Sequence, residues 1–268
     1  MKKLLLFPTL LVCANAALIA SSSKAEISRI LQGSGIKGGF VAHVGSKDGS
    51  ATNELRPNES FQVQALVTDA SELDAMRKEI RKAAGTYGPI AADLWKGGQL
   101  PYIDNLVNLL LIEEASDVSQ KEIKRVLTPL GKAYQKKDGK WKGIDKQWSE
   151  DIDEWTHYLH GADGNAVAKD SRVGPPRRLQ WVGSPRWSRH HDRMASMSAM
   201  TSSKGRLFYV MDEGSRVSIQ LPPDWKLVAR DAFNGVVLWK RKIPKWHHHL
   251  WPLKSGPTQL ARRLVSEG

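Results

Sequence analysis

Residues 106–112 most constrain how this chain folds, because they are apolar at every position except Asn108. A strand with one face in water alternates apolar and polar side chains, whereas a strand covered on both faces is apolar throughout. Two further apolar runs, residues 40–44 and 61–68, lie upstream. Together the three runs predict a sheet whose central strands are covered on both faces.

Helical patterns separate these apolar runs. One predicted helix begins at Ser71 and places Met76 and Ile80 on the same face. Another begins at the capping box formed by Ser119 and Glu122. Strands that alternate with helices pair in parallel through right-handed crossovers. The order therefore predicts an α/β fold with a doubly wound, Rossmann-like sheet.

The first 25 residues have the layout of a secretory signal peptide. Lys2 and Lys3 precede an apolar run over residues 4–12, and small residues follow, with Ala16 and Ala25 as candidate cleavage positions. A membrane anchor is the competing interpretation, but the apolar stretch is shorter than the roughly 20 residues that cross a bilayer. We expect this segment to be removed and the protein to be exported, to the periplasm or outside the cell.

The composition changes along the chain. Nine of the ten tryptophans lie at or after Trp141, and seven of the eight histidines lie at or after His157. We therefore expect an α/β domain over residues 26–140 and a different domain over residues 141–268. The single cysteine, Cys13, lies in the signal segment, so the mature chain has no disulfide and no cysteine-based zinc site.

The second segment reads as antiparallel β structure. Residues 206–211 form a strand-like run, and residues 227–231 and 236–240 flank the dipeptide Asn234-Gly235. Asn-Gly is a strong hairpin signal because both residues tolerate positive φ. The segment is expected to be all-β.

The net charge of +12, from 40 basic and 28 acidic residues, favours an anionic partner. Export argues against nucleic acid and leaves an acidic glycan or a protein partner open. Arg178 and Arg189 interleave with Trp181 and Trp187. Such a pattern either stacks on sugars or packs inside the protein as cation–π pairs.

Histidine clusters suggest metal binding or acid/base chemistry, but we expect neither. Consecutive histidines, as in residues 190–191 and 247–249, point to opposite faces of a strand and do not converge on one ion. Asp153, His157 and His160 are candidates for acid/base work. As part of a charge run at a domain junction, they are expected to be solvated. No catalytic residue and no metal ligand is predicted.

Residues 41–49, Val-Ala-His-Val-Gly-Ser-Lys-Asp-Gly, resemble the first strand and glycine-rich loop of class I S-adenosylmethionine-dependent methyltransferases. Residues 100–105 and 125–131 resemble later landmarks of that family. The resemblance implies a Rossmann-like domain with its cofactor loop at Gly45 and Gly49. It also implies a ribose-binding acid near the end of the second strand, where Asp69 is the nearest carboxylate.

Several residues depart from the family pattern. Lys47 stands at the middle glycine of the loop, where a side chain obstructs close approach of the backbone to a cofactor. His43 and Val67 stand at the two positions where the family usually has acidic residues, and Asp69 is out of register with the strand. Asp93 is expected to be a solvated strand-end residue. We therefore expect weak S-adenosylmethionine binding or none, and a degenerate, structural domain.

Residues 229–240 resemble the repeat of quinoprotein-like, pyrroloquinoline-quinone (PQQ) β-propellers, with turn glycine Gly235 and tryptophan Trp239. The order of both segments behind a signal peptide resembles large secreted bacterial proteins, of planctomycete type, that fuse the two domains. A propeller needs about 4 to 8 blades. Residues 141–268 hold strands for the first blade or so, so we expect an N-terminal fragment whose missing blades belong to a longer protein.

These patterns lead to one functional hypothesis and one alternative. The hypothesis is an exported, non-catalytic binding or scaffold protein that needs no cofactor. The alternative is an enzyme, either a methyltransferase that uses S-adenosylmethionine or, at full length, a PQQ-dependent dehydrogenase. The quinone binds in the funnel of a complete propeller, so a single blade does not form that site.

Overall fold

The computed structural model describes residues 23–113, 116–172, 174, 179–185, 189, 196–218, 220–247 and 259–268. The chain divides into two compact units, Met1–Lys146 and Gln147–Gly268. Most of the expected signal segment lies outside the described residues, and residues 23–25 belong to a helix over residues 23–34. Within the described part of the chain, no helix has the length and apolar character needed to cross a membrane.

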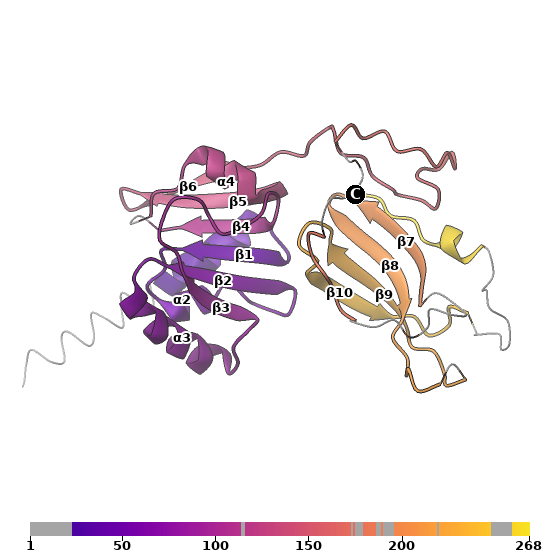
Figure 1. Cartoon of the computed structure of the whole chain (residues 1–268), viewed down its shortest axis with the longest axis horizontal. Helices are drawn as coiled ribbons and strands as arrows, with labels where there is room; N and C mark the ends of the chain where they lie inside the picture. The colour runs from indigo at the N-terminus through magenta and orange to yellow at the C-terminus, as the bar shows by residue number, and fades with distance from the viewer. Residues whose placement is uncertain are drawn as a thin grey trace, which may run out of the picture. The chain divides into compact units, whose positions relative to one another are not determined.

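The first unit is built on a six-stranded sheet in the order β3-β2-β1-β4-β5-β6 (Figure 1). Its first five strands pair in parallel and β6 pairs antiparallel with β5. The expected doubly wound α/β architecture is confirmed. The strands are β1 (Gly39–Val44), β2 (Phe61–Val67), β3 (Ile90–Leu94), β4 (Val107–Ile112), β5 (Leu127–Lys137) and β6 (Lys140–Asp145).

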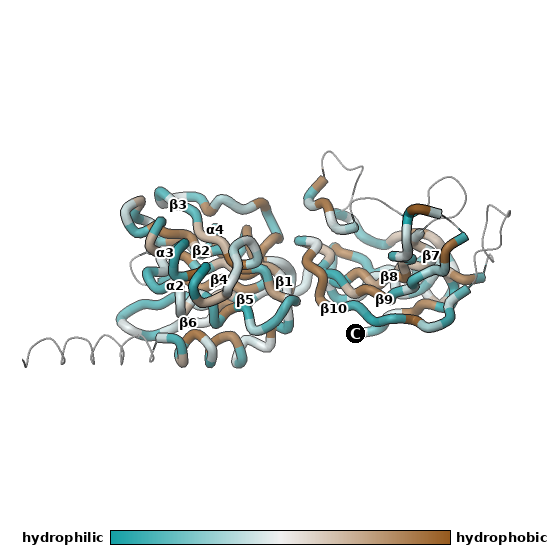
Figure 2. Tube along the Cα trace, turned by 90° about the horizontal axis from the view of Figure 1, so that it is seen from below, coloured by the Kyte–Doolittle hydropathy of each residue, from teal (hydrophilic) through white to brown (hydrophobic). Residues whose placement is uncertain are grey.

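Helices cover both faces of this sheet, as the apolar character of β4 requires. All six residues of β4 are buried and five of them are apolar; Figure 2 colours the chain by hydropathy. One core joins the sheet to the helix over residues 23–34, to α2 (Gly49–Asn53) and to α3 (Ala70–Ala84). A second core on the other face includes α4 (Gln120–Val126).

The helix starts differ in detail from the prediction. The N-cap of α3 is Asp69 and not Ser71, because the Asp69 carboxylate accepts from the Ser71 backbone N–H. Ser119 caps α4 as predicted and accepts from the Glu122 backbone N–H. In a complete capping box the Glu122 side chain would also bond the backbone N–H of Ser119. Here the Glu122 carboxylate instead accepts from the Leu100 N–H and from Arg125.

The first unit extends six residues beyond the domain end expected at residue 140. The expected boundary falls inside the β5–β6 hairpin, where Lys137 pairs with Lys140. Trp141 lies in β6, packs against the first core and has the Lys136 ammonium over its ring. The change in composition led to Trp141 being assigned to the second domain, whereas Trp141 belongs to β6, which completes the α/β sheet.

The second unit contains a four-stranded antiparallel sheet in the order β10-β9-β8-β7 (Figure 1). The expected antiparallel structure is confirmed, although one sheet is not a propeller. The hairpin at Asn234-Gly235 has a longer turn than predicted: only Gly235 has positive φ, and Asp231 accepts from the Phe233 and Asn234 N–H groups. The strands are β7 (Met197–Ser203), β8 (Arg206–Asp212), β9 (Trp225–Asp231) and β10 (Val237–Lys242).

Candidate functional site

The carboxyl ends of the parallel strands in the first unit bring the predicted site residues together. The Gly45 N–H donates to the Leu66 carbonyl at 2.7 Å, and the Glu113 N–H donates to the Val44 carbonyl at 2.9 Å. These bonds place the ends of β1, β2 and β4 at one edge. The chain runs outward from β1 through β2 to β3 and then crosses to β4 on the other side of β1, and ligands of open α/β sheets bind at such a switch point.

Packing within the protein requires a glycine at position 45. Its φ is +74°, and an added Cβ would lie 2.1 Å from the Ser116 hydroxyl oxygen. Ser116 follows β4, and its hydroxyl is buried without a hydrogen-bond partner. The loops after β1 and β4 therefore touch directly at this glycine.

Gly49 is required by the close approach of α3. An added Cβ would lie 2.9 Å from the Glu79 Cβ and 3.0 Å from the Met76 sulfur. The Gly49 N–H donates to the Glu79 carboxylate at 2.9 Å. The two glycines of the loop are thus explained by turn geometry and helix packing, which are two of the three roles glycines have in such loops.

The Lys47 side chain was expected to obstruct the approach of a cofactor to the loop, and the structure places it elsewhere. Its side chain is 66% exposed, and its ammonium lies 3.4 Å from the Glu72 carboxylate in the first turn of α3. The Lys47 backbone is not in the positive-φ region. The side chain runs toward α3, so the argument that it crowds the loop is corrected.

Asp69 presents a carboxylate at the same edge. Hydrogen bonds from the Ser71 backbone and hydroxyl, and then the Lys47 charge, hold the pKa of Asp69 below its ordinary value. Both bonds use Oδ1, which leaves Oδ2 without a hydrogen bond among the described residues. The register argument against Asp69 is wrong, because β2 ends at Val67 and Asp69 lies in the following turn. Val67 itself is buried in the core.

A buried histidine beneath the loop was missed as a site residue. His43 has 1% exposure; its Nδ1 lies 3.0 Å from Thr52 Oγ1, and its Nε2 lies 3.3 Å from Glu113 Oε1. Glu113 also lies 4.0 Å from the Lys136 ammonium. Glu113 directly follows the apolar β4 run, and this position at a strand end was the available sequence signal.

Acidic groups outnumber basic ones at this edge. Asp93 is in β3, half exposed, and accepts from Gln64 at 2.6 Å while Arg77 lies 3.4 Å away. The expectation of a solvated Asp93 agrees with this exposure. The carboxylates at the edge are Asp69, Glu72, Asp93 and Glu113. Lys47, Arg77 and Lys136 each lie within 4.0 Å of one of these carboxylates, and Asp69 has no such ion pair among the described residues.

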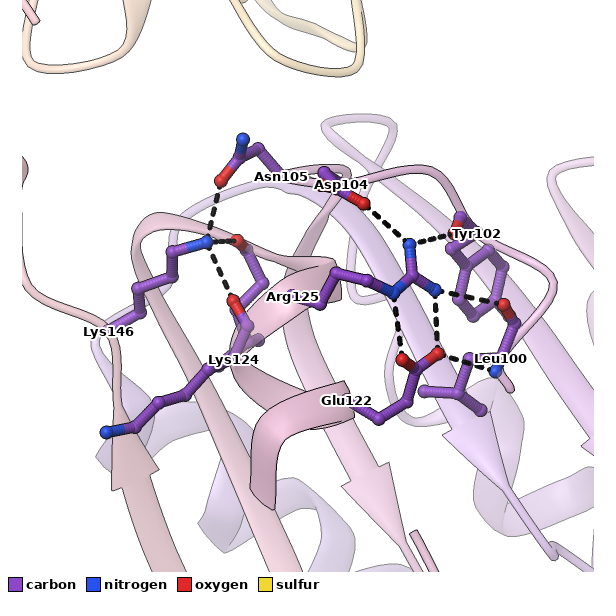
Figure 3. Close-up of polar contacts among 9 residues, drawn as sticks. Leu100, Tyr102, Asp104, Asn105, Glu122, Lys124, Arg125 and Lys146 are labelled. Carbon is purple, nitrogen blue, oxygen red and sulfur yellow. Dashed lines mark hydrogen bonds and ion pairs between the residues drawn. The ribbon is translucent and has the colours of Figure 1, made fainter. Parts of the chain in front are cut away.

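A polar network around Arg125 lies at the opposite, amino edge of the sheet (Figure 3). Arg125 donates to the Glu122 and Asp104 carboxylates and to the Tyr102 and Leu100 carbonyls, at 2.6–3.2 Å. These contacts tie the loop before β4 to α4. Every partner is part of the fold itself, so the network is structural.

In the second unit, the charged run that contains Asp153 and His160 is less exposed to solvent than predicted. His160 is buried, and its Nε2 lies 2.7 Å from an Asp153 carboxylate oxygen. Asp153 also accepts from the Lys169 N–H, so the pair fastens a loop. His247 packs against the Trp225 ring. Among the described residues no three potential ligands group around a metal position, and His190, His191, His248 and His249 lie outside them.

The mixed, mainly parallel sheet with helices on both faces is that of a doubly wound, Rossmann-like fold. No protein-family model matches the chain, and no curated protein matches it.

Solved structures of methyltransferases are similar to part of the chain. A candidate S-adenosyl-L-methionine-dependent methyltransferase from Methanococcus maripaludis shares 20% identity over 50% of this chain and 66% of its own, with a TM-score of 0.37. A candidate sarcosine dimethylglycine methyltransferase from Galdieria sulphuraria shares 17% identity over 42% and 46%, with a TM-score of 0.37. Geranyl diphosphate methyltransferase in complex with SAM shares 14% over 42% and 48%, also at 0.37. The chain thus spans about half to two thirds of their lengths.

The expectation of a non-catalytic scaffold is wrong. It rested on Lys47 in the loop and on His43 and Val67 at two positions where the resembled family has acids. Two of these grounds fall, because Lys47 pairs with Glu72 and Asp69 presents a carboxylate after β2. The alternative drawn from the sequence, an S-adenosylmethionine-dependent enzyme, replaces it as the hypothesis.

Proposed function

We propose that the first unit binds S-adenosylmethionine at the carboxyl edge of its sheet and transfers the methyl group to an acceptor. The observation that carries this proposal is the Asp69 carboxylate, whose pKa is lowered by Ser71 and by Lys47 of the loop after β1, and whose Oδ2 makes no hydrogen bond among the described residues. A carboxylate with a free oxygen accepts hydrogen bonds from the two ribose hydroxyls of a nucleoside.

The residues at this edge fit such a cofactor at its ribose end. S-adenosylmethionine, when bound, supplies an electrophilic methyl group, which the acceptor attacks with a lone pair while the sulfur keeps the electrons of its broken bond. Asp69 would hold the ribose and orient the nucleoside. The buried His43–Glu113 pair fixes the end of β1 against that of β4, and Glu113 stays partly exposed at the switch point. Positioning of this kind lowers the barrier by restricting approach geometry.

The Asp69→Asn variant tests the proposed ribose contact. It keeps the size of the side chain and its capping oxygen but removes the charge, so the S-adenosylmethionine dissociation constant is expected to rise at least about tenfold, the effect of losing one to two charge-assisted hydrogen bonds. Isothermal titration of the full chain measures this change. Asp74→Asn makes the same charge change on the exposed side of α3 and should leave the constant unaltered.

Two outcomes would overturn the proposal. One is no detectable binding of S-adenosylmethionine at millimolar concentration to the folded wild-type chain. The other is equal weakening by Asp69→Asn and Asp74→Asn, since this would show a general charge effect and no contact at Asp69. A wild-type dissociation constant of about 10 μM, roughly −7 kcal/mol, would support it directly.

For the second unit we propose a propeller-blade module. Each of its strands pairs with the next one in sequence, as in a blade. The Trp181 ring lies against Gly235, where an added Cβ would come within 2.5 Å of it, and the Trp181 indole N–H donates to the Ala232 carbonyl at 2.9 Å. Trp181 thereby docks a preceding segment on the β9–β10 turn, which supports stacking of successive blades by tryptophans.

Gly235→Ala is expected to lower the unfolding free energy of the second unit more than Gly164→Ala does. Both glycines have positive φ, at +75° and +69°, but only Gly235 has a neighbour, the Trp181 ring, within 4 Å of an added Cβ. The difference between the two variants isolates the displaced ring and should be about 1–3 kcal/mol. Urea unfolding followed by tryptophan fluorescence measures both, and equal losses would contradict the docking.

A further inference from the structure

The positive charge of the first unit is concentrated in the β5–β6 hairpin, at one edge of its sheet (Figure 1). Residues 132–146 contain six lysines and two aspartates, whereas residues 23–131 contain 13 basic and 14 acidic residues. The hairpin therefore carries the whole excess of positive charge in residues 23–146. A surface with one sign of charge attracts ligands of the opposite sign.

Three of these lysines lie on one face of the hairpin. Lys137 and Lys140 are directly opposite each other across the turn, and Lys142 follows Lys140 by two residues in β6. Residues two apart on a strand share a face, and so do residues directly opposite in an antiparallel pair. All three lysines are exposed. Their charges form a row along the edge strand, with about 7 Å between the Cα atoms of Lys140 and Lys142.

The turn holds two like charges against each other. Asp138 and Gly139 form it, with φ of +51° and +71°, as in a type I′ hairpin turn. A two-residue turn fixes the register, so Lys137 and Lys140 stay opposite. Like charges directly opposite each other destabilise a sheet. Lys137, Lys140 and Lys142 form no ion pair with any described residue, so their neutralisation requires an anionic partner.

The opposite face of the hairpin differs in charge and in aromatic content. There Lys136 pairs with the Glu26 carboxylate at 3.2 Å and lies over the Trp141 ring. The tryptophan is thus on the other side from the three lysines, where it does not provide a platform for stacking nucleobases beside them. No large apolar side chain of residues 132–146 is exposed, so the lysine face has none to insert into a bilayer.

The choice of lysine also bears on the ligand. An ammonium is a point charge on a flexible stem, whereas a guanidinium recognises a single phosphate or carboxylate through two parallel hydrogen bonds. A row of exposed ammonium groups suits repeated ionic contacts along a chain. The sequence left an acidic glycan open as a partner, and the lysine row is the surface in the first unit that fits one.

We propose that this face of the β5–β6 hairpin binds an acidic polysaccharide, whose carboxylate or sulfate groups pair with Lys137, Lys140 and Lys142. The polymer follows the row of charges along the edge strand and neutralises the like-charge pair beside the turn. The inference does not depend on S-adenosylmethionine binding, because the three lysines lie in β5 and β6, whereas Gly45 and Asp69 follow β1 and β2.

Dextran sulfate is the probe, and uncharged dextran is its control. Titrated into the full chain at low salt, dextran sulfate is expected to bind and dextran is not. The hairpin variant, Lys137→Gln with Lys140→Gln and Lys142→Gln, should weaken dextran sulfate binding at least tenfold and reduce its salt dependence, because fewer counterions are released. A control variant should change the dissociation constant less than twofold. It removes three exposed charges in and near α3, through Lys78→Gln, Lys82→Gln and Lys96→Gln.

Equal weakening by the two variants would overturn the proposal, since it would show an effect of net charge alone. No dextran sulfate binding to the wild-type chain would also overturn it. Phosphatidylserine vesicles and oligothymidylate, at equal concentration of charge, are expected to bind at least tenfold more weakly than dextran sulfate. Equal or tighter binding of either one, lost in the hairpin variant, would assign this face to a membrane or to nucleic acid and refute the polysaccharide.

A single substitution separates folding from binding. Lys140→Glu replaces the like-charge pair with Lys137 by a pair of opposite charges. The Tm of the ligand-free protein is expected to rise, while dextran sulfate binding should weaken at least tenfold. A binding loss together with a higher Tm cannot come from a misfolded hairpin. Unaltered binding, whatever the Tm, would refute the site, and a lower Tm would contradict the unfavourable pair from which the proposal is argued.

Discussion

Arg189→Met is expected to lower the unfolding free energy of the second unit by about 3–5 kcal/mol, as breaking a buried ion pair does when one charge stays behind. The side chains of Arg189 and Asp212 are 1% and 0% exposed, and Arg189 Nη1 lies 2.7 Å from the Asp212 carboxylate. Arg189 also donates to the carbonyls of Pro222, Ser218 and Leu221. Methionine fills similar space but removes the cation beside the Asp212 carboxylate, which keeps the Gly214 and Asp224 N–H donors, and takes a donor from each of these carbonyls.

Urea unfolding followed by tryptophan fluorescence measures the effect, because most tryptophans lie in the second unit. Arg216→Met removes an exposed arginine near the same pair and should cost less than about 0.5 kcal/mol. Adding Asp212→Asn to Arg189→Met should recover part of the loss, since the uncompensated charge is then gone. A loss below about 1 kcal/mol for Arg189→Met would contradict burial of the pair.

Local periodicity carried most of the fold prediction. The apolar run of β4 predicted a strand covered on both faces because no other environment suits six successive buried residues. The face of Met76 and Ile80 located α3 for the same reason. The β5–β6 hairpin was not predicted. The side chains of β6 are largely charged and exposed, so its sequence does not show the pattern of a strand, and Trp141 matched the composition of the second unit.

The candidate site was predictable in position but not in its contacts. Gly45 and Asp69 follow apolar strands, so the sequence placed both at the carboxyl edge. The direction of the Lys47 side chain depends on Glu72, and the need for glycine at position 45 depends on Ser116. These partners are distant along the chain or lie on another element, and single-sequence patterns contain no information on which residues meet. The sequence therefore indicated a loop obstructed by Lys47, where the structure turns that side chain toward Glu72.

The Arg125 network provides the second large effect. Arg125→Ala is expected to lower the unfolding free energy of the first unit by about 2–4 kcal/mol, because several hydrogen bonds to partly buried acceptors are lost together. Both Arg125 and Glu122 are mostly buried, at 21% and 15% exposure (Figure 3). Lys124→Ala removes an exposed cation one position earlier in α4 and should cost less than about 0.5 kcal/mol. Urea unfolding of both variants measures the difference.

The same pair makes stability depend on pH in a stated direction. The hydrogen bond from Arg125 holds the pKa of Glu122 below its ordinary value of 4.5 in the folded protein. A carboxyl with a depressed pKa stabilises the fold fully above its unfolded pKa, and this contribution is lost as the pH falls through the folded value. The stability gap between wild type and Arg125→Ala should therefore be constant near neutral pH and narrow progressively below about pH 4.5. Urea unfolding of both proteins between pH 7 and pH 3 measures the gap. A gap that stays the same throughout that range would contradict a contribution from the Glu122 charge and would leave the Leu100 and Tyr102 carbonyls and Asp104 as the partners through which Arg125 stabilises the loop.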